Sequence, residues 1–240
     1  MKGKKYAAVV LSAGKGTRMN SSVPKQYLLL EGKPVLYYAL QAFEESMVDE
    51  IVLVTGQDEI EYCQKEIVEK YGFTKVIAVT AGGAERYHSV FCGLTELNCL
   101  KNRPDYVMIH DGARPFINDE IISRCAQTAE KFQACAAGMP VKDTIKIADD
   151  SLFAKETPQR KYVWQIQTPQ AFAFPLIYQA YEELMKREQK GEVFAVTDDA
   201  MVLETICGQK VKLTEGSYEN IKITTPEDLK LAKAFFPKIR

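Results

Sequence analysis

A short apolar run near the start of the chain breaks abruptly into a loop that contains glycines. Residues 7–11 (AAVVL) predict a buried strand, because the run is short, contains two valines and ends at a turn-forming Ser-Ala-Gly sequence. The loop at residues 12–19 therefore leaves the carboxyl end of a strand, which is where ligands bind in open α/β sheets. Gly14 and Gly16 let backbone N–H groups approach an anion without a Cβ atom in the way. Phosphate is the anion that we expect there.

This loop matches neither of two common phosphate-binding patterns. Met19 stands where a dinucleotide-binding fingerprint has its third glycine, and no Gly-Lys-Ser/Thr sequence completes a Walker A loop. Two cations follow instead: Arg18, two residues after Gly16, and Lys25, in a Pro-Lys-Gln triplet. A guanidinium and an ammonium group beside a glycine loop suit a polyphosphate whose charge changes during reaction. The same residues could form an ordinary surface turn with two solvated cations.

Composition favours one domain that binds neither nucleic acid nor membrane. A chain of 240 residues, 46% of them hydrophobic, is long enough for one substantial core. The 31 basic and 32 acidic residues nearly balance, so there is no general attraction to nucleic acid or to anionic lipid. The apolar stretch before Ser12 is too short for a signal peptide or a membrane helix, and we expect a cytoplasmic protein.

The cysteines show no metal-binding pattern. There is no Cys-x-x-Cys pair, and the two histidines complete no zinc site with the cysteines at a recognised spacing. We expect reduced and mostly buried thiols at Cys63, Cys92, Cys99, Cys125, Cys135 and Cys207.

Strand and helix patterns alternate up to about residue 140. Helical periodicity covers residues 34–47, 60–71 and 86–97, and the strands are predicted at residues 51–55, 75–80, 106–109 and 136–141. Between residues 141 and 166 the alternation instead predicts two antiparallel strands, at TIKIA and KYVWQI. Such a hairpin is marginal alone, so a partner chain is its natural cover. The fold class is therefore α/β, with a mostly parallel, doubly wound sheet and a protruding β-hairpin arm in one domain at residues 1–240.

The last third of the chain returns to helices and strands. Residues 168–172 predict a turn into a helix opened by Pro175, and residues 210–213 and 220–224 predict a last pair of strands. On such a strand Lys222 faces away from its two isoleucine neighbours, which suits a lysine that binds phosphate. Thr197 is predicted to cap a helix, which would give the two aspartates that follow it a purely structural role.

Several polar residues lie where predicted strands and helices meet. Arg86 and Ser89, three residues apart at a helix start, can face one ligand, although either could cap the helix or face water. Asp111, at the carboxyl end of a strand beside the phosphate loop, is placed to organise magnesium on a nucleotide. Arg114, restrained by the following proline, can clamp a product or acceptor, or form an exposed salt bridge.

Ordered motifs along the chain resemble one group of enzymes. They are LSAGKGTRM at 11–19, PKQYL at 24–28, GGAERYHSV at 82–90, HDGARP at 110–115, VKDT at 141–144, TPQ at 168–170, VTDDA at 196–200 and NIKIT at 220–224. Over almost its whole length the chain resembles the nucleotidyltransferases that make CDP-activated sugar alcohols, and most of all the 2-C-methyl-D-erythritol 4-phosphate cytidylyltransferase family. The resemblance implies a Rossmann-like fold. It also implies cytidylyl transfer from CTP to 2-C-methyl-D-erythritol 4-phosphate, with release of pyrophosphate, in non-mevalonate isoprenoid synthesis.

The resemblance also implies roles for single residues. Catalysis falls to Arg18 and Lys25, which would stabilise charge as pyrophosphate departs. The nucleotide-binding residues are Ala13, Gly14, Lys15, Gly16, Gly83, Arg86, Ser89, Asp111 and Gly112. The acceptor-binding residues are Arg114, Thr144, Arg160, Thr168, Thr197 and Lys222. Thr144 and Arg160 would reach the site across a homodimer formed by the arm, and Asp111 would hold Mg²⁺ or another divalent cation.

Within this resemblance, His110 is better explained as a hydrogen-bonding residue than as a base, because a phosphate monoester is already ionised near neutral pH. Gly112 stands where the family often has alanine or serine, and we expect it to loosen the turn. Two alternatives stay open. A ribitol 5-phosphate cytidylyltransferase shares several of these motifs. A non-catalytic nucleotide-sensing module predicts the loss of transfer residues, yet Arg18, Lys25 and Lys222 are all present.

Overall fold

A seven-stranded sheet forms the centre of the protein. The computed structural model describes residues 3–14 and 23–236, so Lys15, Gly16 and Arg18 of the predicted site lie outside the described residues. The strand order is β11-β7-β10-β6-β1-β4-β5. These strands are β1 (Tyr6–Leu11), β4 (Glu50–Thr55), β5 (Val76–Ala81), β6 (Tyr106–Asp111), β7 (Ala134–Pro140), β10 (Trp164–Ala173) and β11 (Lys212–Glu215). Only β10 of these runs antiparallel to its neighbours, β6 and β7.

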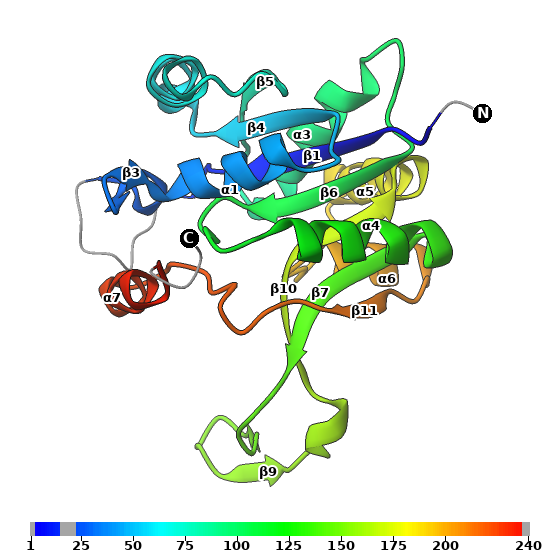
Figure 1. Ribbon diagram of the computed structural model, residues 1–240. Coiled ribbons are helices and arrows are strands. Elements are labelled where there is room, and N and C mark those ends of the chain that lie inside the picture. The colour runs from blue at the N-terminus through cyan, green and yellow to red at the C-terminus, as the bar shows by residue number, and fades with distance from the viewer. Residues whose placement is uncertain (1–2, 15–22, 237–240) are drawn as a thin grey trace.

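Helices cover both faces of this sheet (Figure 1). One face carries α1 (Val35–Glu45), α4 (Asp119–Phe132) and the continuous α2 (Ile60–Tyr62) and π-helical η4 (Cys63–Glu69). The other carries α3 (Arg86–Asn98), α5 (Phe174–Gln189) and α6 (Asp199–Cys207). Strand β1 is buried on both sides, with Ala8 and Val10 in one core and Ala7 and Val9 in the other, as parallel sheets require.

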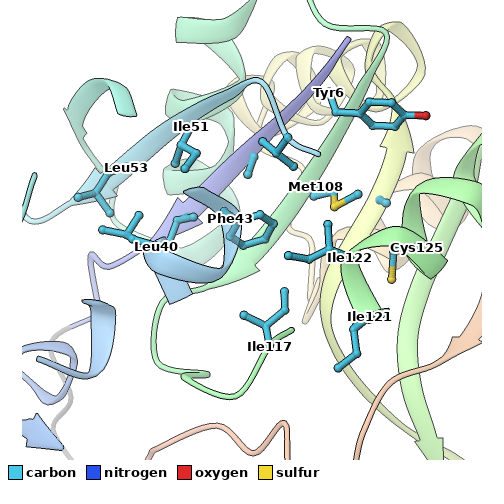
Figure 2. Packing of buried hydrophobic residues seen from close by; sticks show 14 of the residues in the cluster. Tyr6, Leu40, Phe43, Ile51, Leu53, Met108, Ile117, Ile121, Ile122 and Cys125 are labelled. Atoms are coloured by element: carbon cyan, nitrogen blue, oxygen red, sulfur yellow. The ribbon is translucent and has the colours of Figure 1, made fainter. Parts of the chain in front are cut away.

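The first of these cores is assembled from strongly apolar helix faces. Figure 2 shows Leu40 and Phe43 of α1 packing over Ile51 of β4, with Ile121 and Ile122 of α4 beside them. A smaller third cluster joins α7 (Pro226–Phe235) to the short strand β2 (Leu29–Leu30), which pairs with β3 (Lys33–Pro34). The α/β class and the mostly parallel, doubly wound sheet are thus confirmed. The loops at the carboxyl edge of this sheet form the candidate site that is described below.

The protruding arm is present, but its strands differ from the prediction. Strand β8 (Ile147–Ala148) pairs antiparallel with β9 (Ala154–Glu156), and a 3₁₀ turn, η5 (Arg160–Tyr162), follows. The arm extends away from the sheet at the bottom of Figure 1. The second arm strand predicted at KYVWQI is wrong, because Trp164 to Ile166 already pair with β7 in the main sheet.

Three other local predictions are wrong. Residues 168–172 are not a turn but part of β10, which pairs with β6 there. Residues 220–224 form no strand; this extended segment is held by single bonds such as that from Ile223 N to Ala113 O at 2.8 Å. The cap of α6 is Asp198, whose carboxylate accepts from Met201 N at 2.8 Å, and not Thr197.

All six cysteines are free thiols. Cys63, Cys125 and Cys135 are buried, but Cys99 and Cys207 are exposed, so the expectation of mostly buried thiols holds for only half of them. Within residues 3–14 and 23–236, no helix combines the length and the apolar character that crossing a bilayer requires.

Candidate active site

A cavity of about 850 Å³ opens at the carboxyl ends of β1 and β6. Its wall combines the loop after β1, the 3₁₀ turn η2 (Lys25–Tyr27), the start of α3, the end of β6 and the segment that follows β11. The predicted site residues that line it are Ala13, Gly14, Lys25, Gly83, Arg86, Ser89, Asp111 and Lys222. Segments far apart in sequence therefore converge where the phosphate loop was expected.

The carboxylate of Asp111 lies at the centre of a group of cations. Lys222 Nζ is 2.7 Å from its Oδ2 atom, and Arg86 Nε is 3.3 Å from its Oδ1 atom. Arg114 Nε lies 3.9 Å from Oδ2. Burial opposes ionisation of this carboxyl, but the three cations outweigh burial and hold the pKa of Asp111 well below its usual range. Asp111 is therefore an anion at neutral pH.

Arg86 is fixed by a second carboxylate that sequence reasoning did not assign to the site. Its Nη1 and Nη2 atoms donate to the two oxygens of Asp199 at 2.9 and 2.8 Å. Tyr181 donates its hydroxyl to Asp199 Oδ1 at 2.6 Å, and both residues are fully buried. Burial disfavours the charged guanidinium, but Asp199 and Asp111 outweigh it and raise the pKa of Arg86 well above its ordinary value. The bidentate pair thus fixes the cation that faces Asp111.

Asp199 left a weak signal in the sequence. Two aspartates follow Thr197, but one carboxylate is enough to cap a helix, and Asp198 does so. The role of Asp199 becomes visible only in the fold, where α3 brings Arg86 and α5 brings Tyr181 to its carboxylate.

The loop before α3 is closed by Ser89. Its hydroxyl accepts from Gly83 N at 3.1 Å and donates to Glu85 O at 3.2 Å. A Cβ atom on Gly83 would lie 2.4 Å from the Cβ of His88, so only glycine fits. Gly83 lines the cavity, but its N–H group is already used within the loop.

A chain of hydrogen bonds runs behind Asp111. Its backbone N–H donates to Thr168 Oγ1 at 3.1 Å, and Thr168 Oγ1 lies 3.1 Å from His110 Nδ1. His110 Nε2 lies 3.2 Å from the carbonyl of Arg114, which can only accept, so Nε2 carries the proton and Nδ1 accepts from Thr168. Burial lowers the pKa of His110 to about 4, so the ring is neutral. This geometry agrees with a hydrogen-bonding role for His110, and it gives Thr168 a place behind the cavity wall.

Arg114 and Asn220 hold the segment that carries Lys222. Arg114 Nη1 donates to Asn220 O at 2.8 Å, and Asn220, fully buried, donates from Nδ2 to Thr168 O at 2.9 Å. These bonds, rather than a strand ladder, aim Lys222 at Asp111. Arg114 does not appear in the cavity wall that the described residues form.

Gly112 is a packing residue. Its N–H donates to Leu11 O at 2.8 Å, and an added Cβ would lie 2.7 Å from Leu36 Cδ1. The expectation that Gly112 loosens the turn is therefore wrong, because α1 packs tightly against it.

Besides Arg114 and Thr168, three more predicted acceptor-binding residues lie outside the described cavity wall. Thr144 and Arg160 belong to the arm, where Arg160 Nη1 donates to Lys142 O at 2.8 Å. Thr197 is exposed and contacts Met201 Sδ at 3.7 Å.

Residues 6–238 match the family model for 2-C-methyl-D-erythritol 4-phosphate cytidylyltransferase. The chain belongs to this family. It is therefore an enzyme, a cytidylyltransferase, and the alternative of a non-catalytic sensing module is not supported.

Relatives of that name are similar over nearly their full lengths. The protein from Lachnospira eligens is 50% identical over 229 residues, which are 95% of this chain and 97% of that protein. The one from Caldanaerobacter subterraneus subsp. tengcongensis is 46% identical over 235 residues, 97% of this chain and 99% of that protein. The crystal structure of 4-diphosphocytidyl-2C-methyl-D-erythritol synthase from Anaerococcus prevotii is similar with a TM-score of 0.82 at 36% identity, covering 98% of this chain and 96% of that chain.

The carboxylate of Asp111 fits a nucleotide-bound magnesium ion. Mg²⁺ commonly takes one or two carboxylates, with substrate phosphates and water completing its shell. Asp111 is ionised, lines the cavity and keeps lone pairs beyond those used by Lys222 and Arg86. Among the described residues no group of three or more His, Cys, Asp or Glu side chains could hold a metal by itself.

Replacing Asp199 tests the buried pair. Asp199→Asn keeps the shape but removes the charge that faces Arg86, and breaking a buried pair from one side costs about 3–5 kcal/mol. We expect the free energy of unfolding, measured by urea denaturation, to fall by about 3 kcal/mol. Asp198→Asn is the matched control, since asparagine also caps helices well. Equal losses in the two variants would contradict the assignment.

Acidification is expected to destabilise the protein through His110. Its folded pKa of about 4 lies below the ordinary 6.5, so between these pH values the unfolded chain binds a proton that the folded protein does not. The free energy of unfolding should fall by about 3 kcal/mol as pH decreases across this interval. His110→Gln should show a shallower fall in urea titrations at several pH values. Identical slopes for the variant and the wild type would argue against a buried neutral His110.

Proposed function

We propose that this enzyme transfers the cytidylyl group of CTP to 2-C-methyl-D-erythritol 4-phosphate. The acceptor phosphate attacks the α-phosphorus of CTP in line with the departing pyrophosphate, and the product is the CDP-linked methylerythritol of the non-mevalonate isoprenoid pathway. The observation that carries the proposal is the convergence of Lys25, Asp111 and Lys222 on one cavity, in a chain of this family.

The cavity offers what a nucleotidyl transfer requires. Ala13 and Gly14 line it at the carboxyl end of β1, where backbone groups and open space suit a triphosphate. Lys25 would stabilise the charge that develops as pyrophosphate leaves, together with Arg18. The acceptor needs no general base, because its phosphate is ionised near neutral pH and His110 is held neutral behind the wall.

Lys222 is suited to the phosphate of the acceptor. Its ammonium group is paired with Asp111 at 2.7 Å, so it is held at the cavity wall before any ligand binds. A preorganised cation of this kind reduces the reorganisation that accompanies reaction.

Magnesium is part of the proposal. Asp111 would hold the ion together with the phosphates of CTP, and the ion would neutralise part of the triphosphate charge. The contribution of the chain is the carboxylate that Arg86 and Lys222 keep ionised.

The arm is proposed to join two copies of the chain. It exposes apolar side chains far from the core, among them Leu152 at 86% and Phe153 at 72% exposure. A two-stranded hairpin with such a surface is marginal alone and is better covered by a second chain. In that arrangement Thr144 and Arg160, which stay out of the described cavity wall of their own chain, would contribute to the cavity of the partner. We place the enzyme in the cytoplasm.

The choice of acceptor is tested by pyrophosphate release. Purified enzyme with CTP and Mg²⁺ should release pyrophosphate with 2-C-methyl-D-erythritol 4-phosphate, and at least about tenfold more slowly with ribitol 5-phosphate at equal concentration. A preference for ribitol 5-phosphate would keep the chemistry but overturn the acceptor. Release with neither acceptor would overturn the proposed function, and omission of the metal should abolish the signal.

The dimer is tested by sedimentation. The wild-type protein should sediment as a dimer, and the double variant Leu152→Ser, Phe153→Ser should shift toward the monomer with a weaker response to the acceptor. Val193→Ser, at a residue that is 94% exposed outside the arm, is the control and should leave the dimer intact. A monomeric wild type that is fully active would contradict this part of the proposal.

A further inference from the structure

The turn that brings Lys25 to the cavity is anchored on two sides. Gln26, which is 2% exposed, donates from Nε2 to the carbonyl of Ser12 at 2.7 Å, at the end of β1. The next residue, Tyr27, is 8% exposed and lies outside the described cavity wall. Its hydroxyl reaches the junction between β4 and the 3₁₀ turn η3 (Gln57–Glu59). Lys25 is therefore followed directly by two buried anchors.

The second anchor centres on one carboxylate oxygen. Glu59 Oε2 accepts from the Tyr27 hydroxyl at 2.9 Å, from Thr55 Oγ1 at 3.0 Å and from Gly56 N at 3.2 Å. Cys63 Sγ, at the start of the π-helical η4, lies 3.0 Å from the Tyr27 oxygen. Because Tyr27 gives its proton to Glu59, the thiol is the donor in that contact.

Tyr27, Thr55 and Cys63 are buried, and Glu59 is partly buried. A hydrogen-bond network whose polar members all find partners fixes those members in place. The Tyr27 ring also packs edge to face on Tyr62, with ring centres 5.0 Å apart. Burial raises the pKa of Tyr27 well above its ordinary value, so the hydroxyl stays a donor at any physiological pH.

We propose that Tyr27 and Glu59 are positioning residues for the transfer reaction, which set the reach of Lys25 by fixing turn η2 to the end of β4. The inference rests on the proposed function. Lysine is a point charge on a flexible stem, so its place in the cavity depends on where its backbone is held. An error of about 1 Å in the position of a catalytic group can cost about 100-fold in rate.

The test separates turnover from nucleotide binding. Tyr27→Phe keeps the ring and its packing but removes the hydroxyl, and we expect kcat to fall about tenfold while the Kd for CTP, from calorimetry, changes less than about twofold. Glu59→Gln should act in the same direction. The double variant should be no slower than about the slower single variant, because the two residues act as one unit. Lys25→Ala sets the lower limit of the rate.

Tyr62→Phe is the matched control. The Tyr62 ring packs against that of Tyr27, but Tyr62 is 43% exposed, and loss of its hydroxyl should leave kcat unchanged. Thermal unfolding of each variant shows whether it is folded at the assay temperature. If Tyr27→Phe is unfolded there, Glu59→Gln decides the question.

Each outcome has one meaning. An inactive wild type overturns the proposed function and this inference with it. An active wild type with an unchanged kcat in the folded Tyr27→Phe variant, or with single losses that multiply in the double variant, overturns the inference alone. A loss confined to CTP affinity also overturns it, since a positioning role acts on turnover.

Discussion

The ionised carboxylate of Asp111 is the interaction on which the site depends. Burial of a carboxyl group that is 7% exposed raises its pKa, and the charges of Arg86, Lys222 and Arg114 outweigh that effect. The dependence is mutual, because the three cations around Asp111 would repel one another without the anion between them. Asp111 therefore gathers positive charge at the wall of the cavity in which we propose that the triphosphate binds.

Each cation is in turn held by the fold. Arg86 donates hydrogen bonds to Asp199 of α6. Lys222 lies on a segment that is held through Asn220, which is hydrogen-bonded to Arg114 and to Thr168. The cations thus come from α3, from the loop after β6 and from the segment after β11, and no single element builds the site. Turn η2 follows the same principle, since buried neighbours rather than local propensity fix the position of Lys25.

Much of the fold could be predicted because its signals are local. Apolar runs such as that of β4, and helical stripes such as Leu36 and Leu40, are set by neighbouring residues and by burial on both faces of a parallel sheet. The errors lie where long-range pairing overrides local pattern. TPQ resembles a turn but is drawn into β10 by pairing with β6, and residues 220–224 alternate like a strand yet pair with no strand in the described part of the chain.

In the candidate site, too, residues with a local sequence pattern could be predicted and residues that depend on long-range packing could not. Glycines and cations next to the end of a strand predict a phosphate site from sequence alone, and the structure brings Gly14, Lys25 and Asp111 to one cavity. Asp199, Asn220 and Glu59 could not be found in that way, because their importance comes from what packs against them. Polar residues that act through a neighbour leave no spacing pattern in the sequence.

The state of Asp111 can be measured directly. In protein labelled with ¹³C at the aspartate carboxyl carbons and assigned with Asp111→Asn, the Asp111 signal should keep the shift of an ionised carboxylate from about pH 8 down to about pH 3. Exposed aspartates should titrate near the lower end of this range. A midpoint for Asp111 at or above the ordinary aspartate value of about 3.9 would contradict a site organised by this charge.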